Sequence, residues 1–254
     1  MKKYIYLLVF ITPISVLLLL EALLIRPRSF WYLIAAALFI SIISILMFAK
    51  AGRRKEAWWN LLILPMLMIF SLAIYASLIV NQAIIHVLFI FILFFLYHYL
   101  NNSYYFLIKP DKYEKSFLEN ISSYGGFLAF FFAASSAYAV KTLLGIPLWI
   151  PAISMFLIIL AVLYQNVWVN KATFKQKFIY VLIPALILME IAIAIYFFPF
   201  NHNTLGLILA ICYYIIIGLV RVFLRNTPNR RSIKLYLLFG FLSILIILFT
   251  TKWI

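Results

Sequence analysis

Residues 58–108, WWNLLILPMLMIFSLAIYASLIV-NQ-AIIHVLFIFILFFLYHYLNNSYYFLI, decide the fold, because they contain no Asp, Glu, Lys or Arg. They form two apolar runs, Trp58–Val80 and Ala83–Ile108, which only Asn81 and Gln82 separate. A helix needs about 20 apolar residues to cross the hydrocarbon of a bilayer. Both runs reach that length, and the short separation predicts a helical hairpin that crosses the bilayer twice.

The whole chain has this character. Of its 254 residues, 68% are hydrophobic and 11% are charged, whereas a soluble domain is about half apolar and a quarter charged. We therefore predict an all-α transmembrane helix bundle of about nine spans, forming one integral membrane domain over residues 1–254 without a soluble domain. The last run is short, so a count of eight spans stays as an alternative. The nine runs cover residues 4–25, 30–49, 58–80, 83–108, 117–140, 146–169, 178–198, 204–224 and 235–250.

The net charge of +15 is distributed unevenly between the two sides that alternating spans define. Cytoplasmic segments of membrane proteins are rich in Lys and Arg. All 21 of these residues fall on the side of the N-terminus except Arg26, Arg28, Lys141 and Lys252. This asymmetry predicts a cytoplasmic N-terminus, an external C-terminus and a multi-pass protein of the plasma (inner) membrane. It also explains the positive charge by contact with anionic lipid headgroups, so we expect no nucleic-acid partner.

The N-terminus resembles a secretory signal, since Lys2 and Lys3 precede an apolar run. Arg26-Pro27-Arg28 follows that run where a cleavage site would need small residues, so we expect an uncleaved first span. The single cysteine, Cys212, allows no disulfide within the chain. The sequence contains no HExxH or GxSxG motif and no glycine-rich nucleotide-binding loop. We therefore predict no catalytic residue, cofactor or metal site, and whether the protein is an enzyme stays open.

Two backbone signals concern helix packing. Gly125, Ala129, Ala133 and Ala137 recur every four residues, and small residues at this spacing let another helix approach closely. Prolines lie inside three of the runs, and each removes one backbone hydrogen bond from its helix; they are Pro13, Pro65 and Pro184.

Ionisable residues inside a span are costly and therefore indicate function or a specific partner. Glu190 is the deepest, near the middle of its run. A carboxylate at this depth needs a partner or stays protonated, so we expect Glu190 to face the interior of the bundle. It could relay protons, contact a cationic substrate or form a hydrogen bond across helices.

The other candidates form two groups. Glu21 and His86 lie at similar depth near the predicted external surface, where they could pair with each other or reach water. The second group lies near the cytoplasmic ends of four spans and could line a pocket open to the cytoplasm: Asn101, Asn102, Glu119, Asn120, Gln165, Asn166 and Arg221. His98 is a further candidate, which neighbours Asn101 and Asn102 by helical spacing. Within this group we expect an ion pair between Arg221 and Glu119.

These residues suggest transport or lipid handling through a polar intramembrane cavity. Two alternatives remain: a non-catalytic scaffold or assembly partner in a membrane complex, or an intramembrane enzyme without a recognisable motif. A cavity that reaches Glu190 would favour transport. A dry core with an exposed small-residue or aromatic face would favour assembly with another membrane protein or with a second copy. Several converging titratable groups would favour an enzyme.

Overall fold

The fold of the described residues is all-helical. The computed structural model describes residues 2–52, 58–109, 115–147, 149–170, 174–224 and 230–251. In these residues nine α-helices are all long and apolar enough to cross a membrane, which confirms the predicted helical bundle with nine spans. Their bounds, together with one short 3-10 helix, are α1 Lys2–Ile25, η1 Pro27–Ser29, α2 Phe30–Gly52, α3 Trp58–Ser77, α4 Gln82–Ile108, α5 Lys115–Leu144, α6 Trp149–Val169, α7 Phe174–Tyr196, α8 His202–Leu224 and α9 Arg230–Thr250.

Helix ends differ from the apolar runs where polar capping or backbone geometry intervenes. The run that was expected to continue to Val80 ends as a helix at Ser77. The Asn81 side chain then accepts a hydrogen bond of 3.0 Å from the Ala83 amide and caps α4. Before α6, Gly145 has a φ of 61° and Pro147 follows, so the helix begins at Trp149.

The chain divides into two compact units, residues 1–125 and 126–254. The division falls between Gly125 and Gly126, so α5 begins in unit 1 and continues in unit 2. Both units consist of membrane-length helices.

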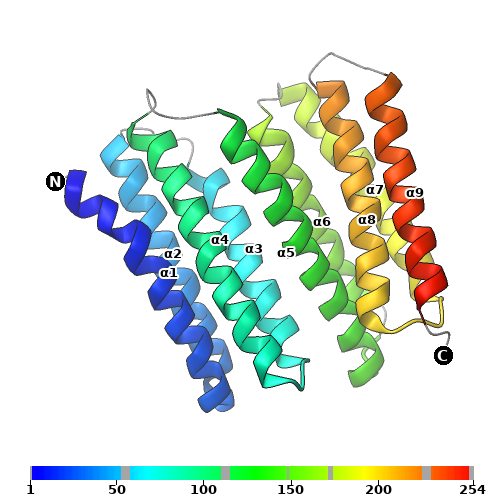
Figure 1. Ribbon diagram of the computed structural model, residues 1–254, viewed down its shortest axis with the longest axis horizontal. Coiled ribbons are helices and arrows are strands. Elements are labelled where there is room, and N and C mark those ends of the chain that lie inside the picture. The colour runs from blue at the N-terminus through cyan, green and yellow to red at the C-terminus, as the bar shows by residue number, and fades with distance from the viewer. Residues whose placement is uncertain are drawn as a thin grey trace. The chain divides into compact units, whose positions relative to one another are not determined.

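In unit 1, α1 packs on α2 and α4, and α3 packs on the same two helices (Figure 1). The core between them is almost entirely apolar and fully buried, as at Val16, Ile45, Met68 and Ile92. Within it, the hydroxyls of Thr12 and Ser44 lie 2.5 Å apart and join α1 to α2. Small residues and hydroxyls at such contacts are typical of helix packing in membranes.

Pro65 explains the position of a buried tyrosine in the same core. Because proline has no amide proton, the carbonyl of Leu61, four residues earlier, loses its helical partner. The hydroxyl of Tyr99, which is fully buried on α4, donates to this carbonyl at 2.8 Å. In a membrane interior an unpaired carbonyl costs free energy, so the α3–α4 contact repairs the bond that Pro65 removes.

Unit 2 contains α6, α7, α8 and α9 in addition to the later part of α5 (Figure 1). Here α6 and α8 contact each other, and α7 contacts both of them. Gly206 of α8 lies against α5. A Cβ at this position would be only 2.7 Å from the amide nitrogen of Ser135 on α5, so α5 and α8 meet at close range. α9 packs on α8, and Gly240 is the only residue of α9 that is buried among those whose burial is described.

Candidate functional site

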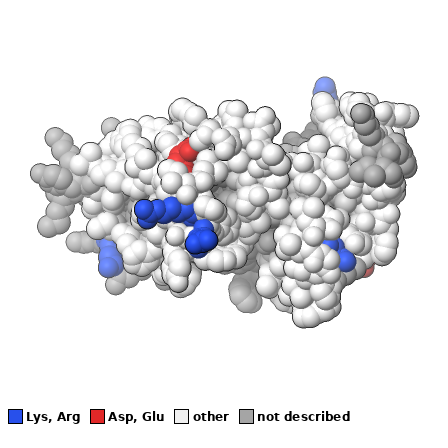
Figure 2. All heavy atoms as spheres, turned by 90° about the horizontal axis from the view of Figure 1, so that it is seen from below, with Lys and Arg blue, Asp and Glu red and all other residues white. Residues whose placement is uncertain are grey.

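Charged side chains are sparse on the described surface. Figure 2 shows the face where α1 ends and α2 begins. Most of the surface visible there in each unit is uncharged. The few ionisable groups inside the spans therefore define the candidate sites.

The side chains of Glu21 and His86 are within hydrogen-bond distance of each other in unit 1. The Nδ1 atom of His86 lies 2.9 Å from the carboxylate of Glu21, which joins α1 to α4 one turn from their shared end. The side chain of His86 is 48% exposed and that of Glu21 is 32% exposed. The pairing that equal depth suggested is therefore present, but at this exposure such a pair contributes little to stability.

Among the remaining candidates of unit 1, Asn101 and Asn102 form hydrogen bonds with neighbouring residues. His98 is exposed on α4, and its carbonyl accepts a 2.6 Å hydrogen bond from the Asn102 side chain. The Asn101 side chain accepts from the Tyr6 hydroxyl at 3.4 Å. Asn120 is exposed and Glu119 is half-buried.

The polar candidates of unit 2 do come together, around the side chain of Asn166. Its Oδ1 atom accepts a hydrogen bond of 2.8 Å from Nη2 of Arg221. Its Nδ2 atom donates to the Tyr213 hydroxyl at 2.6 Å and to the Val162 carbonyl at 3.1 Å. Asn166 thus links the end of α6 to α8 and fixes the arginine. We call Asn166, Tyr213 and Arg221 the Arg221 cluster, and we name Gln165 with it because it precedes Asn166 on α6 and its side chain is also buried.

Three polar atoms of the Arg221 cluster, two donors and one acceptor, have no hydrogen-bond partner among the described residues. Nε of Arg221 and both amide atoms of Gln165 are buried without a hydrogen-bond partner there. Gln165 and Asn166 are each 1% exposed, and Tyr213 is fully buried. Buried polar groups are normally paired, so the cluster is a built polar site with unused hydrogen-bonding capacity and a fixed positive charge.

Gly126 of α5 closes the cluster on one side. A Cβ at this position would lie 3.0 Å from the Tyr213 hydroxyl and 3.2 Å from Nδ2 of Asn166. Ring packing between Tyr213 and Phe130, with centroids 4.8 Å apart, supports the tyrosine from the same helix. Sequence reasoning missed Tyr213 because one tyrosine inside an apolar run has no distinguishing signal.

The expected cytoplasmic polar group is divided between the units. Asn101, Glu119 and Asn120 belong to unit 1, whereas Gln165, Asn166 and Arg221 belong to unit 2. The pairing of Arg221 with Glu119 therefore stays a prediction. What the structure brings together is the half of the group that α6 and α8 carry.

Glu190 lies apart from all of these residues. It is exposed on α7, so the expectation that it faces the interior of the bundle is wrong. The physical reason is the helical phase of α7, which buries Ala185, Leu188, Ala192 and Ile195. Glu190 lies about 160° around the helix from Leu188 and Ala192, at 100° per residue.

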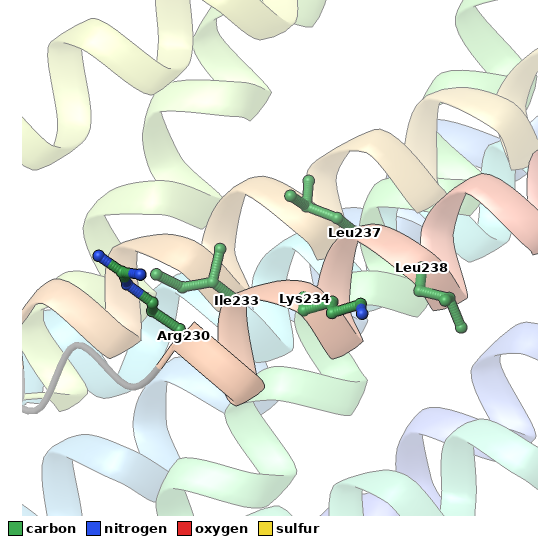
Figure 3. A pocket seen from close by; sticks show the side chains of 5 residues that line it. All are labelled: Arg230, Ile233, Lys234, Leu237 and Leu238. Atoms are coloured by element: carbon green, nitrogen blue, oxygen red, sulfur yellow. The ribbon is translucent and has the colours of Figure 1, made fainter.

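Two hollows of the described residues are lined by neither Glu190 nor the Arg221 cluster. One, of about 40 Å³, lies between α5, α6 and α7 and is lined mainly by apolar residues, with Tyr138 and Lys141 at its polar end. The other, of about 460 Å³, is an open depression on α9 that Figure 3 shows with Arg230, Ile233, Lys234, Leu237 and Leu238. Its lining comes from one helix, so it is a feature of the outer surface.

The described residues contain no group of three or more His, Cys, Asp or Glu side chains that could hold a metal ion. What they contain is nine apolar helices with one buried cationic cluster, and this defines a multi-pass integral membrane protein. Residues 11–250 match the model of DUF5656, a protein family of unknown function, and the chain belongs to that family. No curated protein and no solved structure matches it.

Proposed function

We propose that this membrane protein transports or handles an anionic amphiphile, such as a phospholipid with an anionic headgroup, and that the Arg221 cluster binds the anionic group. The observation that carries this proposal is the guanidinium of Arg221, which Asn166 holds in place while its Nε–H remains buried and unused. An arginine fixed in this way matches the geometry of a phosphate or carboxylate oxygen pair.

The hydrogen-bonding balance of the cluster supports an anion over a cation. The free groups are the Nε–H of Arg221 and the amide group of Gln165, and the Tyr213 hydroxyl accepts from Asn166 with its own proton still available. Donors and a positive charge therefore outnumber acceptors. Hydrogen bonds from such groups to an ionised oxygen are about twice as strong as neutral ones.

The depth of the cluster supports a lipid as the source of the anion. Arg221 lies three residues before the end of α8 at Leu224, which is about 4.5 Å along the helix. A guanidinium at this depth reaches the level of the headgroup phosphates. The charge asymmetry of the sequence favours the cytoplasmic side of a plasma (inner) membrane for this end, and anionic lipids concentrate in cytoplasmic leaflets.

Lipid binding by variants of Arg221 tests the proposal. We expect Arg221→Gln to weaken phosphatidylglycerol binding about tenfold, because it removes a charge-assisted hydrogen bond to the headgroup. Glutamine keeps an uncharged polar side chain at this position, and far-ultraviolet circular dichroism of the variant checks that the fold is preserved. Native mass spectrometry of the protein in detergent, titrated with phosphatidylglycerol or phosphatidylcholine, gives the affinities.

Arg230→Gln is the matched control, since Arg230 is an exposed arginine at the beginning of the next helix (Figure 3). We expect this variant to bind phosphatidylglycerol within about threefold of the wild type, as for an exposed charge. Equal losses in both variants would show only general attraction to anionic lipid and would contradict the proposal. Competition by inorganic phosphate at equal concentration would assign the site to a free anion instead.

A second candidate is the role of assembly partner, which the exposure of α9 favours. This helix is as apolar as the other spans, yet large side chains such as Phe239, Phe241 and Phe249 are 63–85% exposed on it. An assembly partner would keep a second chain bound. The same mass spectra report this, since retained multiples of the chain mass without lipid selectivity would favour assembly over lipid handling.

A further inference from the structure

A hollow between α5, α6 and α7 lies at the other end of unit 2 from the Arg221 cluster. Its volume is about 40 Å³, and Lys141 and Tyr196 line its mouth. Lys141 lies three residues before the end of α5, and Tyr196 is the last residue of α7. Only residues 197–201 separate α7 from α8, whereas Arg221 lies near the far end of α8. The hollow and the Arg221 cluster therefore belong to opposite surfaces of the membrane.

The hollow extends from these helix ends toward the middle of the membrane. Its deepest lining residues are Met155, six residues after α6 begins at Trp149, and Met189, seven residues before Tyr196. These separations correspond to about 9 Å and 10 Å along the helices. Ile193 also lines the hollow and is 40% exposed, so the hollow adjoins the outer surface of the unit.

The wall of the hollow is apolar below its mouth. Each of the three helices contributes one alanine to it, and these small side chains leave the space open: Ala137, Ala152 and Ala192. The Tyr138 hydroxyl is already used, because it donates to the Ala192 carbonyl at 2.8 Å. A water molecule needs about 10–15 Å³ of such volume and several polar partners. The hollow thus has room for roughly three methylene-sized groups but few partners for water, which favours an apolar chain.

Lys141 supplies a positive charge at the mouth of the hollow. Its Nζ atom lies 5.7 Å from the centroid of the Tyr196 ring, a cation–π contact that holds the ammonium beside the opening. Lys141 forms no ion pair with a carboxylate of the described residues. Its place near the helix end, about 4.5 Å along α5, puts the ammonium within reach of the headgroups. A lysine in such a position attracts anionic lipids.

We propose that this hollow binds an acyl chain of a phospholipid whose anionic headgroup contacts Lys141. A cation at the surface with an apolar space beneath it has the same order of groups as an anionic phospholipid in its leaflet. The inference rests on the proposed function for its role in lipid handling. Arg221 binds the anionic lipid in one leaflet, and Lys141 binds it in the other.

Photoactivatable lipids test this site in the full chain. The protein is reconstituted in phosphatidylcholine vesicles that contain a trace of phosphatidylglycerol or phosphatidylcholine with a diazirine on one acyl chain. On illumination the diazirine releases dinitrogen, and the carbene inserts into a nearby C–H bond of the protein. Peptide mass spectrometry then locates the adducts. We expect adducts on the peptides that contain Met155 and Met189, about fivefold more with phosphatidylglycerol, as for one lysine near an anionic headgroup.

Three variants separate the headgroup contact, the hollow and the Arg221 cluster. Lys141→Gln should reduce the preference for phosphatidylglycerol to less than about twofold, with unchanged melting in detergent. Ala152→Leu, which places a larger apolar side chain in the hollow, should reduce the adducts of both lipids. Arg221→Gln should leave the adducts at the hollow within about twofold of the wild type. Failure at one site is therefore distinguishable from failure at the other.

Lys109→Gln is the matched control, because Nζ of Lys109 also lies over a tyrosine ring, 5.9 Å from the Tyr104 centroid, yet Lys109 lines neither hollow. It should keep the preference of the wild type. An equal loss in Lys109→Gln and Lys141→Gln would show only general attraction to anionic lipid and would overturn the proposal. The same preference in the wild type and in Lys141→Gln, or no adducts on covered peptides of the hollow, would overturn it as well.

Discussion

Replacing Asn166 by Leu should lower the free energy of unfolding by about 3 kcal/mol, because the guanidinium of Arg221 loses the acceptor that holds it at 2.8 Å. The same change removes the donors to Tyr213 and to the Val162 carbonyl. Asn166 is 1% exposed, so water does not replace these partners. Equilibrium unfolding in detergent measures the loss.

The double-mutant cycle with Arg221→Leu separates this pair from other effects of the substitutions. Arg221→Leu alone should cost about 2 kcal/mol, since it strands Oδ1 of Asn166. The double variant contains neither the charge nor its acceptor, so its loss should be smaller than the sum by about 1 kcal/mol or more. A coupling below about 0.5 kcal/mol would show that the two side chains act independently.

Tyr99→Phe should cost about 2 kcal/mol, because it leaves the Leu61 carbonyl without a partner inside unit 1. This expectation depends on Pro65, whose missing amide proton leaves that carbonyl free. In a Pro65→Ala background the restored amide of residue 65 can bond to Leu61. There the Tyr99→Phe substitution should cost less than about 1 kcal/mol.

The control for this prediction is Tyr138→Phe on α5. The Tyr138 hydroxyl donates to the Ala192 carbonyl at 2.8 Å, but no proline lies four residues after Ala192. Tyr138→Phe should therefore lower the free energy of unfolding by less than Tyr99→Phe does, and its effect should not depend on Pro65. If Tyr99→Phe costs the same with and without Pro65, the proposed repair of the proline site is incorrect. Equilibrium unfolding in the same detergent gives all values.

The number of membrane-length helices was predictable because it follows from a one-dimensional property, the length of apolar runs between polar breaks. All nine runs became helices, and the short Asn81-Gln82 separation became a cap and a turn. The ends were less predictable, as between Ser77 and Val80, because apolarity does not report where the last backbone hydrogen bond forms.

The candidate site was predictable only in part, because side-chain partners depend on helical phase and on neighbouring helices. Equal depth in the membrane left pairing of Glu21 with His86 open beside contact with water, and the two side chains lie 2.9 Å apart. Asn166 was one of the polar residues expected near the end of α6, and its contact with Arg221 depends on the neighbouring helix. The prediction for Glu190 was wrong because a carboxyl group inside a span was expected to face inward. In the structure α7 packs through Leu188 and Ala192, on the opposite side of the helix. Tyr213 could be found only from the contact between α6 and α8.

Movement of an anionic lipid across the membrane tests the central proposal most directly. The protein is reconstituted in phosphatidylcholine vesicles that contain a trace of fluorescent phosphatidylglycerol or fluorescent phosphatidylcholine. An impermeant quencher then reports how fast each lipid leaves the inner leaflet. We predict faster movement of the anionic lipid than of the zwitterionic lipid, lost in Arg221→Gln and retained in Arg230→Gln. Rates equal to those of protein-free vesicles, or equal for both lipids and unaffected by Arg221→Gln, would contradict the account.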